Sequence, residues 1–261
     1  MPVTVFGAGL PIIDVLHLPD FALSRHRTMA WLEDYALANA SVLATAGVPC
    51  IKLQDQTRTA GTAAPDTLSI MVALGRLIWT EFPKLELGII SEAHDPAAEL
   101  SVANAAGANF VRLKVFVGGA MTANGARQGL CASAVAHRVQ LVRRGIAILA
   151  DIHNRTARPL SDETQPLAAQ WAEKVGADGL IITGSDFADS LTRIAAVRRT
   201  VPSRTLLIGG GVTEANVAEA LAASDGVIVS AAFMRTNAAE DDLVRWDADQ
   251  CQRFMDAARA A

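Results

Sequence analysis

The chain has 261 residues, 51% of them hydrophobic, and a formal net charge of −4 at pH 7. This length matches the roughly 250 residues of one (β/α)8 barrel, so a single domain over residues 1–261 is predicted. Interspersed charges argue against a nucleic-acid partner, and no apolar stretch reaches the roughly 18 residues of a transmembrane segment.

Strand-like and helix-like segments alternate along the chain. The predicted strands are Pro11–His17, Val48–Gln54, Leu85–Ser91, Phe110–Val115, Ile146–Ile152, Gly179–Thr183, Thr205–Ile208 and Gly226–Val229. The predicted helices are Arg27–Ala46, Pro65–Phe82, Pro96–Ala106, Ala132–Arg144, Gln165–Val175, Asp186–Thr200, Glu214–Ala223 and Leu243–Ala258. Eight strands, each followed by a helix, predict an α/β fold, a single (β/α)8 TIM barrel.

Glycines separate four predicted helices from the next strand, at Gly47, Gly107, Gly145 and Gly176. A left-handed glycine commonly ends a helix, so these turns are predicted to be structural. The connections from strand to helix are longer and more varied, especially 54–64, 116–131 and 153–164. Function is therefore expected at the C-terminal ends of the strands.

Alternation along the strands predicts which side chains point into the barrel. On the fourth strand, the aliphatic Val111, Leu113, Val115 and Val117 share the face toward the helices. On the second, fourth and fifth strands the inward-facing residues are then Cys50, Lys52, Gln54, Phe110, Arg112, Lys114, Phe116, Ala147, Leu149, Asp151 and His153. The first strand alternates less regularly, but Ile13, Val15 and His17 share one face.

Opposite charges are predicted to meet at the barrel mouth, where Lys114 and Asp151 on neighbouring strands could pair directly. Clustered ionisable groups in a concave site have perturbed pKa values that suit acid and base chemistry, so Asp151, His153 and Lys114 are the catalytic candidates. A buried ion pair that satisfies itself is the alternative. The predicted substrate-binding residues are His17, Lys52, Gln54, Asp55, Arg112 and Thr183.

Two further interpretations of these residues stay open. Asp151 and His153 could share a divalent metal with His17, Asp55 or His94 as a third ligand, although no spacing is specific for a metal site. Lys114, beside the cationic Arg112, could instead form a Schiff base or simply hold an anionic substrate. No motif in the sequence requires a cofactor.

Two consecutive strand ends are rich in small residues, in the segments 208–213 and 225–232. In TIM barrels a phosphate site commonly lies after strands seven and eight. Phosphate is therefore predicted to bind the backbone at Gly209, Gly210, Gly211, Ser230 and Ala231. Thr213 and Glu214 are predicted to start the following helix and to aim its amides at this site; tight turns alone are the other explanation for the glycines.

The chain resembles the BtpA/SgcQ family. The resemblance rests on Ala108-Asn109-Phe110-Val111-Arg112, Val115-Phe116-Val117-Gly118, Ala150-Asp151-Ile152-His153, Ala177–Gly184 and Gly210-Gly211-Val212-Thr213 with Asn216. It implies a TIM-like barrel related to ribulose-phosphate-binding barrels. Three segments depart from the family pattern, at His17–Asp20, Lys52–Gln56 and Lys114, which implies a ligand that differs from that of the typical member.

The sequence favours a metabolic enzyme of isomerase or lyase type that acts on a small phosphorylated sugar- or nucleoside-like metabolite, because such reactions need an acid, a base and a fixed anion. The alternative, which the family's name-giving member implies, is a non-catalytic assembly or stability factor of the photosystem I biogenesis type. Three widely separated cysteines favour reduced thiols, so a cytoplasmic location is expected. A homo-oligomer is expected because barrels frequently associate through their outer helices.

Overall fold

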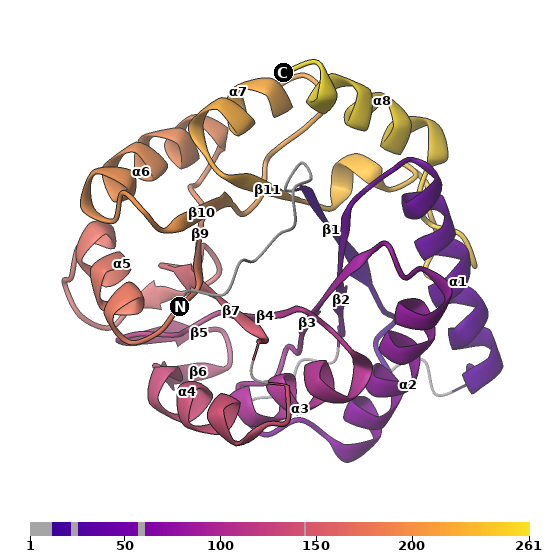
Figure 1. Ribbon diagram of the computed structural model, residues 1–261, viewed down its shortest axis with the longest axis horizontal. Helices are drawn as coiled ribbons and strands as arrows, with labels where there is room; N and C mark the ends of the chain where they lie inside the picture. The colour runs from indigo at the N-terminus through magenta and orange to yellow at the C-terminus, as the bar shows by residue number, and fades with distance from the viewer. Residues whose placement is uncertain (1–11, 22–25, 57–60, 144) are drawn as a thin grey trace.

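Eight parallel strands close into a barrel in the order β1-β11-β10-β9-β7-β4-β3-β2, with helices around the outside (Figure 1). The computed structural model describes residues 12–21, 26–56, 61–143 and 145–261, so Pro11 and Arg144 of the predicted elements lie outside it. The barrel strands are β1 (Ile12–His17), β2 (Cys50–Gln54), β3 (Glu86–Ile90), β4 (Phe110–Leu113), β7 (Ala147–Ile152), β9 (Gly179–Ile182), β10 (Thr205–Ile208) and β11 (Gly226–Val229). The predicted TIM barrel is confirmed.

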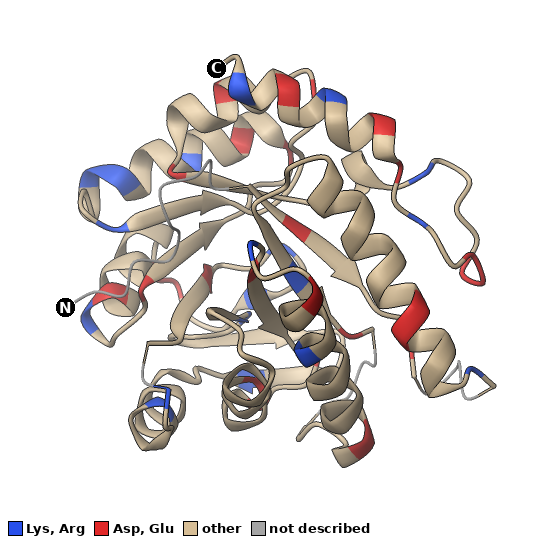
Figure 2. Cartoon of the chain, turned by 45° about the vertical axis from the view of Figure 1, so that its right-hand side comes forward, with Lys and Arg blue, Asp and Glu red and all other residues tan. Residues whose placement is uncertain are grey.

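The outer helices follow the strands along the chain. They are α1 (Met29–Thr45), α2 (Pro65–Glu81), α3 (Pro96–Ala106), α4 (Cys131–Gln140), α5 (Gln165–Lys174), α6 (Phe187–Thr200), α7 (Val217–Ala223) and α8 (Ala248–Arg259). Acidic and basic residues are interspersed over these helices (Figure 2). Among the described residues, no helix combines the length and the apolar character that crossing a bilayer requires.

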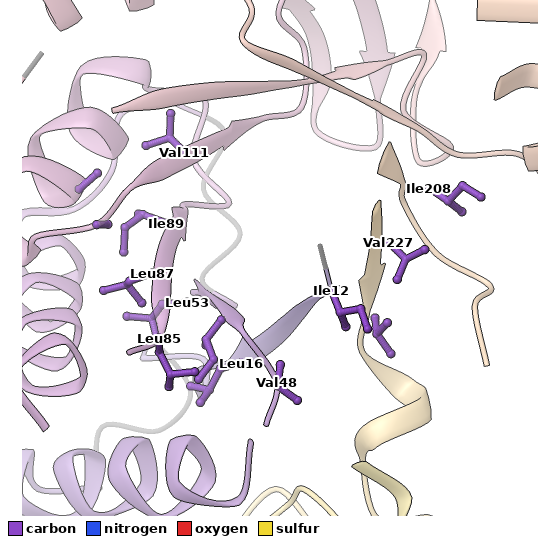
Figure 3. Packing of buried hydrophobic residues seen from close by; sticks show 14 of the residues in the cluster. Ile12, Leu16, Val48, Leu53, Leu85, Leu87, Ile89, Val111, Ile208 and Val227 are labelled. Atoms are coloured by element: carbon purple, nitrogen blue, oxygen red, sulfur yellow. The ribbon is translucent and has the colours of Figure 1, made fainter. Parts of the chain in front are cut away.

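Two apolar layers hold the barrel together. Ile12, Leu53 and Val111 belong to the outer layer, which packs between the strands and the helices (Figure 3). A separate cluster fills the barrel interior and consists of Ile13, Val15, Cys50, Phe110, Ala147, Leu149, Ile181, Leu207 and Ile228. The alternation predicted for the strands is therefore confirmed within them.

Phe110 occupies the middle of the barrel because β3 leaves room for it. A Cβ at Gly88 would lie 2.1 Å from the Phe110 ring, so only glycine fits at this interior position. The prediction that Phe116 also points inward is wrong, since Phe116 packs in the outer layer. β4 ends at Leu113, and the alternation of a strand no longer applies beyond that residue.

A small antiparallel sheet, absent from the predicted elements, lies within two strand-to-helix connections. It comprises β5 (Gly119–Thr122), β6 (Gly125–Gln128) and β8 (Arg158–Pro159), with β5 in the middle. The β5–β6 turn contains Gly125, whose φ of 99° is left-handed. The sheet therefore joins the connection after β4 to the connection after β7.

Three of the four glycines after helices have the predicted left-handed backbone, with φ of 78° at Gly47, 89° at Gly107 and 104° at Gly176. Gly145 is not left-handed, so the prediction is wrong there. The reason is that α4 ends at Gln140, well before this glycine. α8 also begins later than predicted, at Ala248, where the Asp247 side chain accepts a hydrogen bond from the Gln250 amide.

Candidate active site

A cavity of about 550 Å³ opens at the C-terminal ends of the barrel strands. Side chains and backbone from six strand ends and from the loop after β7 line it. The lining includes these residues predicted for the site: His17, Gln54, Arg112, Lys114, Thr183, Gly209, Gly210, Gly211, Ser230 and Ala231. Most of the residues that strand alternation and the glycine pattern predicted for the site therefore line one cavity.

The loop after β10 requires glycine at three consecutive positions. A Cβ at Gly209 would lie 2.2 Å from the Thr183 hydroxyl oxygen, and Gly210 and Gly211 have φ of 144° and 77°. Asn216 fixes this loop, because its Nδ2 donates to the Gly211 carbonyl at 3.1 Å and its Oδ1 accepts from the Thr213 amide at 2.7 Å. The backbone therefore approaches the cavity closely, and the Asn216 side chain bridges Gly211 and Thr213.

The predicted helix start at Thr213 and Glu214 is wrong. α7 begins at Val217, and the Asn216 side chain closes a turn over residues 213–216 instead. The cavity is consequently lined here by a glycine loop and a turn rather than by the first turn of a helix.

The other small-residue segment follows β11 and forms a 3-10 helix, η1 (Ala231–Phe233). Ser230 at its start contacts His17, with 2.8 Å between Oγ and Nε2, while the Gln56 amide nitrogen lies 2.5 Å from the other ring nitrogen of His17. An amide nitrogen only donates, so the proton of the neutral imidazole is on Nε2 and points at Ser230. The Ser230 hydroxyl hydrogen remains available to a ligand.

His17 is neutral at physiological pH. Burial lowers its pKa from 6.5 to about 4, and the positive charges of Lys52 and Arg245 act in the same direction. A neutral ring between Gln56 and Ser230 therefore serves as a hydrogen-bonding group of the cavity rather than as a cation.

Arg155 is a cavity residue that the sequence reasoning missed. It lines the cavity from the loop after β7, and its guanidinium nitrogen lies 3.8 Å from the position that a Cβ on Gly210 would take. Its side chain is exposed, which leaves it free to move toward a ligand. The long connection 153–164 was expected to carry function, but nothing in the spacing singled out this arginine.

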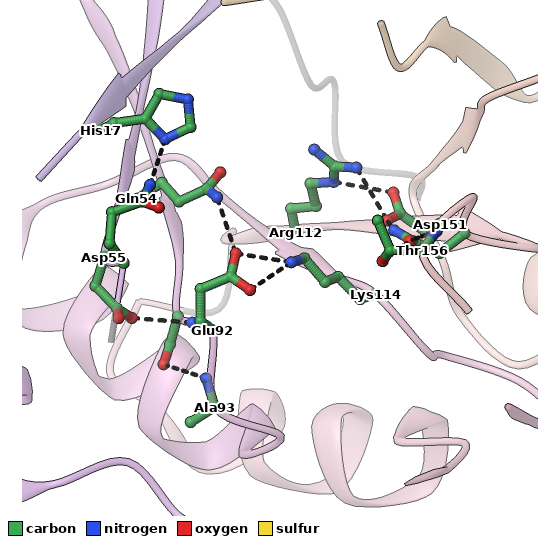
Figure 4. Close-up of polar contacts among 12 residues, drawn as sticks. His17, Gln54, Asp55, Glu92, Ala93, Arg112, Lys114, Asp151 and Thr156 are labelled. Carbon is green, nitrogen blue, oxygen red and sulfur yellow. Dashed lines mark hydrogen bonds and ion pairs between the residues drawn. The ribbon is translucent and has the colours of Figure 1, made fainter. Parts of the chain in front are cut away.

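Lys114 pairs with Glu92 and not with Asp151, which corrects the pairing predicted from neighbouring strands. Its Nζ lies 2.7 Å and 2.6 Å from the two carboxylate oxygens of Glu92 (Figure 4). Glu92 also accepts a hydrogen bond of 2.8 Å from the Gln54 amide. Glu92 was not predicted, although it continues the inward series of alternate residues Glu86, Gly88 and Ile90 on β3.

Asp151 pairs with Arg112 instead. Nε and a terminal nitrogen of the guanidinium lie 2.9 Å and 3.0 Å from the two carboxylate oxygens, and Asn154 donates to one of them. Only 2% of the Asp151 side chain is exposed, against 12% for Arg112. The buried carboxylate thus holds the guanidinium at the cavity wall.

Asp55, Asp151 and His153 are not among the residues that line this cavity. Asp55 is fully buried, and its Oδ2 accepts from the Glu92 backbone amide at 2.9 Å, so it fixes the loop that carries Glu92. His153 follows the end of β7 and has a left-handed φ of 54°. It lines a small adjoining pocket that Lys114, Asp151 and Asn154 also line, with its Nε2 3.7 Å from a Glu163 carboxylate oxygen.

Asp151 and His153 both line this small pocket, so their predicted common face stays a prediction, although His153 lies beyond the end of β7 at Ile152, where strand alternation no longer applies. Burial lowers the pKa of His153, which the charge of Glu163 opposes. Within the described ranges, no three His, Cys, Asp or Glu side chains gather in a way that could hold a metal ion.

Lys52 lies inside the barrel beneath the cavity. It is completely buried, and its Nζ has no hydrogen-bond partner among the described residues. Burial lowers its pKa well below the ordinary range of lysine, and the positive charge of Arg112 adds to the effect.

The cavity continues into a second hollow of about 360 Å³ beneath the β5–β6 turn. His17, Gln54 and Lys114 line both hollows, while Thr122 and Asn124 line only the second. The site is therefore elongated, with the glycine loop at one end, the β5–β6 turn at the other and the Lys114–Glu92 pair between them.

The chain belongs to the BtpA family, which matches residues 9–260. It is 29% identical over 225 residues to an uncharacterised protein of Pyrococcus horikoshii, covering 84% of this chain and 85% of that protein. It is also 29% identical over 152 residues to the photosystem I biogenesis protein BtpA of Synechocystis, covering 57% of this chain and 53% of that protein.

Solved structures share the barrel at low sequence identity. The native KDPGal structure has a TM-score of 0.62 at 18% identity, covering 98% of this chain and 97% of that chain. N-(5'-phosphoribosyl)anthranilate isomerase from Pyrococcus furiosus has a TM-score of 0.58 at 11% identity, covering 97% of this chain and all (100%) of that chain. At such identities the likeness concerns the fold alone.

Proposed function

We propose that this protein is an enzyme that binds a small phosphorylated sugar- or nucleoside-like metabolite and catalyses an isomerase or lyase reaction on it. The observation that carries the proposal is a main cavity lined by a glycine-built loop and Lys114, next to a hollow lined by Lys114 and its partner Glu92. The first suits a fixed anion, and the second suits proton transfer.

The phosphate end of the proposed site lies between the loop after β10 and the start of η1. Gly210 and Gly211 bring the backbone against the cavity, Ser230 offers its hydroxyl hydrogen, and Arg155 supplies a positive charge. Backbone N–H groups of such loops, together with a guanidinium, are typical ligands of a phosphate. In the same class of barrel this position commonly binds phosphate.

The reacting end is assigned to Lys114 and Glu92. An ammonium group and a carboxylate in direct contact can donate and accept a proton at neighbouring atoms of a bound sugar, which is what isomerisation or carbon–carbon cleavage requires. Arg112 lies on the same wall and suits a substrate oxygen, with Asp151 as its positioning residue. His153 has no part in this proposal, because it lines the small adjoining pocket and not the main cavity.

The fold comparison supports this class of ligand. N-(5'-phosphoribosyl)anthranilate isomerase, one of the similar barrels, has a phosphoribosyl compound in its name. Cytoplasmic location and a homo-oligomeric state complete the proposal, and sedimentation of the purified protein would measure the latter.

A thermal-shift screen with inorganic phosphate and phosphosugars tests the proposal. A true ligand at a hundredfold excess over its Kd stabilises the wild type by about 2.7 kcal/mol. Gly211→Ala should weaken this effect, because Gly211 has a φ of 77° at the cavity. Gly125→Ala is the matched control, since Gly125 is also left-handed, with φ of 99°, but lies in the β5–β6 turn. No stabilisation of the wild type by any phosphorylated compound would contradict the proposal.

A second candidate function is a non-catalytic role in photosystem I biogenesis. The Synechocystis relative supports it by its name, and Trp171 and Leu167 on α5 are large apolar residues with 40% and 38% of their surface exposed. This candidate predicts that alanine at the cavity residue Lys114 leaves function intact, whereas alanine at Trp171 abolishes it. Complementation of a strain lacking the protein distinguishes the two.

A further inference from the structure

Lys52 is a buried ionisable residue that has no role in the proposed reaction. It lies on β2 between Cys50, which packs in the barrel interior, and Gln54, which lines both hollows of the cavity. In the barrel sheet it is paired in register with Val15 on β1 and Gly88 on β3. Its side chain therefore lies one layer below the floor of the cavity.

The groups that face Lys52 are mostly cationic or already paired. Arg112 on β4 and Lys114 just after it act on Lys52, and their carboxylate partners, Asp151 and Glu92, each pair with one of these cations. His17 on β1 lies close enough for Lys52 to lower its pKa. Asp14 on β1 also acts electrostatically on Lys52, and its Oδ2 accepts a hydrogen bond of 2.8 Å from Trp246. The Nζ of Lys52 has no hydrogen bond among the described residues, whereas Arg112 and Lys114 each have a carboxylate partner.

A buried ammonium group with no partner is costly, because burial removes its hydration without replacement. Accordingly, burial and the charge of Arg112 lower the pKa of Lys52. A negative group placed over the floor would reverse this balance by supplying the missing counter-charge. The pKa of Lys52 would then rise, and the amine would take up a proton from solvent to become an ammonium ion, with no other bond made or broken.

We propose that Lys52 is the counter-charge for a second anionic group of the substrate, so that the ligand is a phosphorylated compound with a carboxylate or enediolate at the end opposite its phosphate. The elongated shape of the site supports this assignment, since Gln54 and Lys114 separate the glycine loop from the hollow beneath the β5–β6 turn. The inference rests on the proposed function, because it takes the phosphate site as given.

The test is calorimetric titration with two probes, methyl phosphate and 2-phosphoglycolate, in buffers of different ionisation enthalpy. Both probes carry a phosphate group, but only 2-phosphoglycolate carries a carboxylate. Wild-type protein should take up more protons with 2-phosphoglycolate than with methyl phosphate, because a pKa of Lys52 that rises on binding binds protons from solvent. Lys52→Met should lose this extra proton uptake and bind 2-phosphoglycolate about tenfold or more weakly, with its affinity for methyl phosphate unchanged.

Two further variants make the result decisive. Lys52→Gln keeps a polar group without a titratable proton and should behave as Lys52→Met does, and Lys174→Met, which changes an exposed lysine of α5, should behave as wild type. Binding of both probes without a Lys52-dependent proton uptake would overturn this inference and leave the phosphate site standing. Binding of neither probe would overturn the proposed function and the inference together.

Discussion

The two sides of the barrel mouth differ in the groups that line the cavity. On the side of β10 and β11, glycine backbone and small side chains line the cavity, and Asn216 fixes their conformation. On the side of β2, β3, β4 and β7, long charged side chains line it and fix one another in the pairs Arg112–Asp151 and Lys114–Glu92.

This difference assigns a task to each side. A backbone loop has little freedom once its glycines are set, so it suits the part of a substrate that does not change. Ion pairs can exchange partners and protons, so they suit the part that reacts. The same difference predicts that stability depends most on the charged side, whereas affinity for phosphate depends on the glycine side.

The largest effect on stability is expected from Asp151→Asn. The amide would leave the Arg112 guanidinium without its carboxylate at a site where only 12% of that side chain is exposed. Breaking one partner of a buried pair costs about 3–5 kcal/mol of unfolding free energy. Urea denaturation measures it. Asp256→Asn, which breaks an exposed pair with Arg259, should cost less than about 1 kcal/mol; equal losses in the two variants would contradict the comparison.

The next largest effect on stability is expected from lowering the pH. Burial lowers the pKa of His17 to about 4 in the folded protein, against 6.5 for an ordinary histidine. The unfolded chain therefore binds the proton first, and stability is present above pH 6.5 and lost as the pH falls through 4. A shift of this size is worth about 3 kcal/mol. Unfolding free energies at pH 7 and pH 4 should differ less in His17→Gln, and an unchanged difference would refute the role of His17.

A smaller effect of opposite sign is expected from Lys52→Met. Burial lowers the pKa of Lys52, so the unfolded chain binds the proton of this lysine more tightly than the folded protein does. At pH values below the ordinary lysine pKa of about 10.4, Lys52 therefore lowers the free energy of unfolding. Methionine fills the same space without a charge, and Tm at pH 7 should rise by about 2–4 °C for each kcal/mol recovered. The gain should shrink toward pH 10. A fall in Tm would show that the amine is satisfied.

The smallest effect tests the glycine side. Arg155→Met removes the exposed guanidinium next to Gly210 and should weaken the binding of inorganic phosphate by about three- to tenfold, without a change in Tm. Arg158→Met is the control, because Arg158 is also exposed but belongs to β8 and does not line the cavity. Calorimetric titration of both variants with phosphate measures the difference. Equal losses of phosphate affinity in the two variants would show that Arg155 does not bind the phosphate.

Much of the glycine side could be predicted from the sequence. The segment 208–213 reads as a strand that runs into a tight loop, and the requirement for glycine at Gly209, Gly210 and Gly211 is local in the chain. The part that was missed, the turn closed by Asn216, is also local but competes with an equally plausible helix start at Thr213. In the structure the turn forms, with a hydrogen bond of 2.7 Å from the Thr213 amide to the Asn216 side chain.

The charged side could be predicted only in part. Alternation gave the inward direction of Lys52, Arg112 and Asp151, because it follows from strand geometry. Alternation could not give their partners. Glu92, which follows the neighbouring strand β3, pairs with Lys114, and Asp151 pairs with Arg112. Alternation could not give the direction of His153, because this residue lies one position beyond the end of β7, and it lines the small adjoining pocket rather than the main cavity.

The most direct test of the central claim is a crystal structure of the protein with 2-phosphoglycolate bound. The account predicts the phosphate group against the backbone of Gly210 and Gly211 and within hydrogen-bond distance of the Ser230 hydroxyl, with the carboxylate over Gln54 and Lys114. A phosphate group bound elsewhere, with the glycine loop facing an empty cavity, would contradict it.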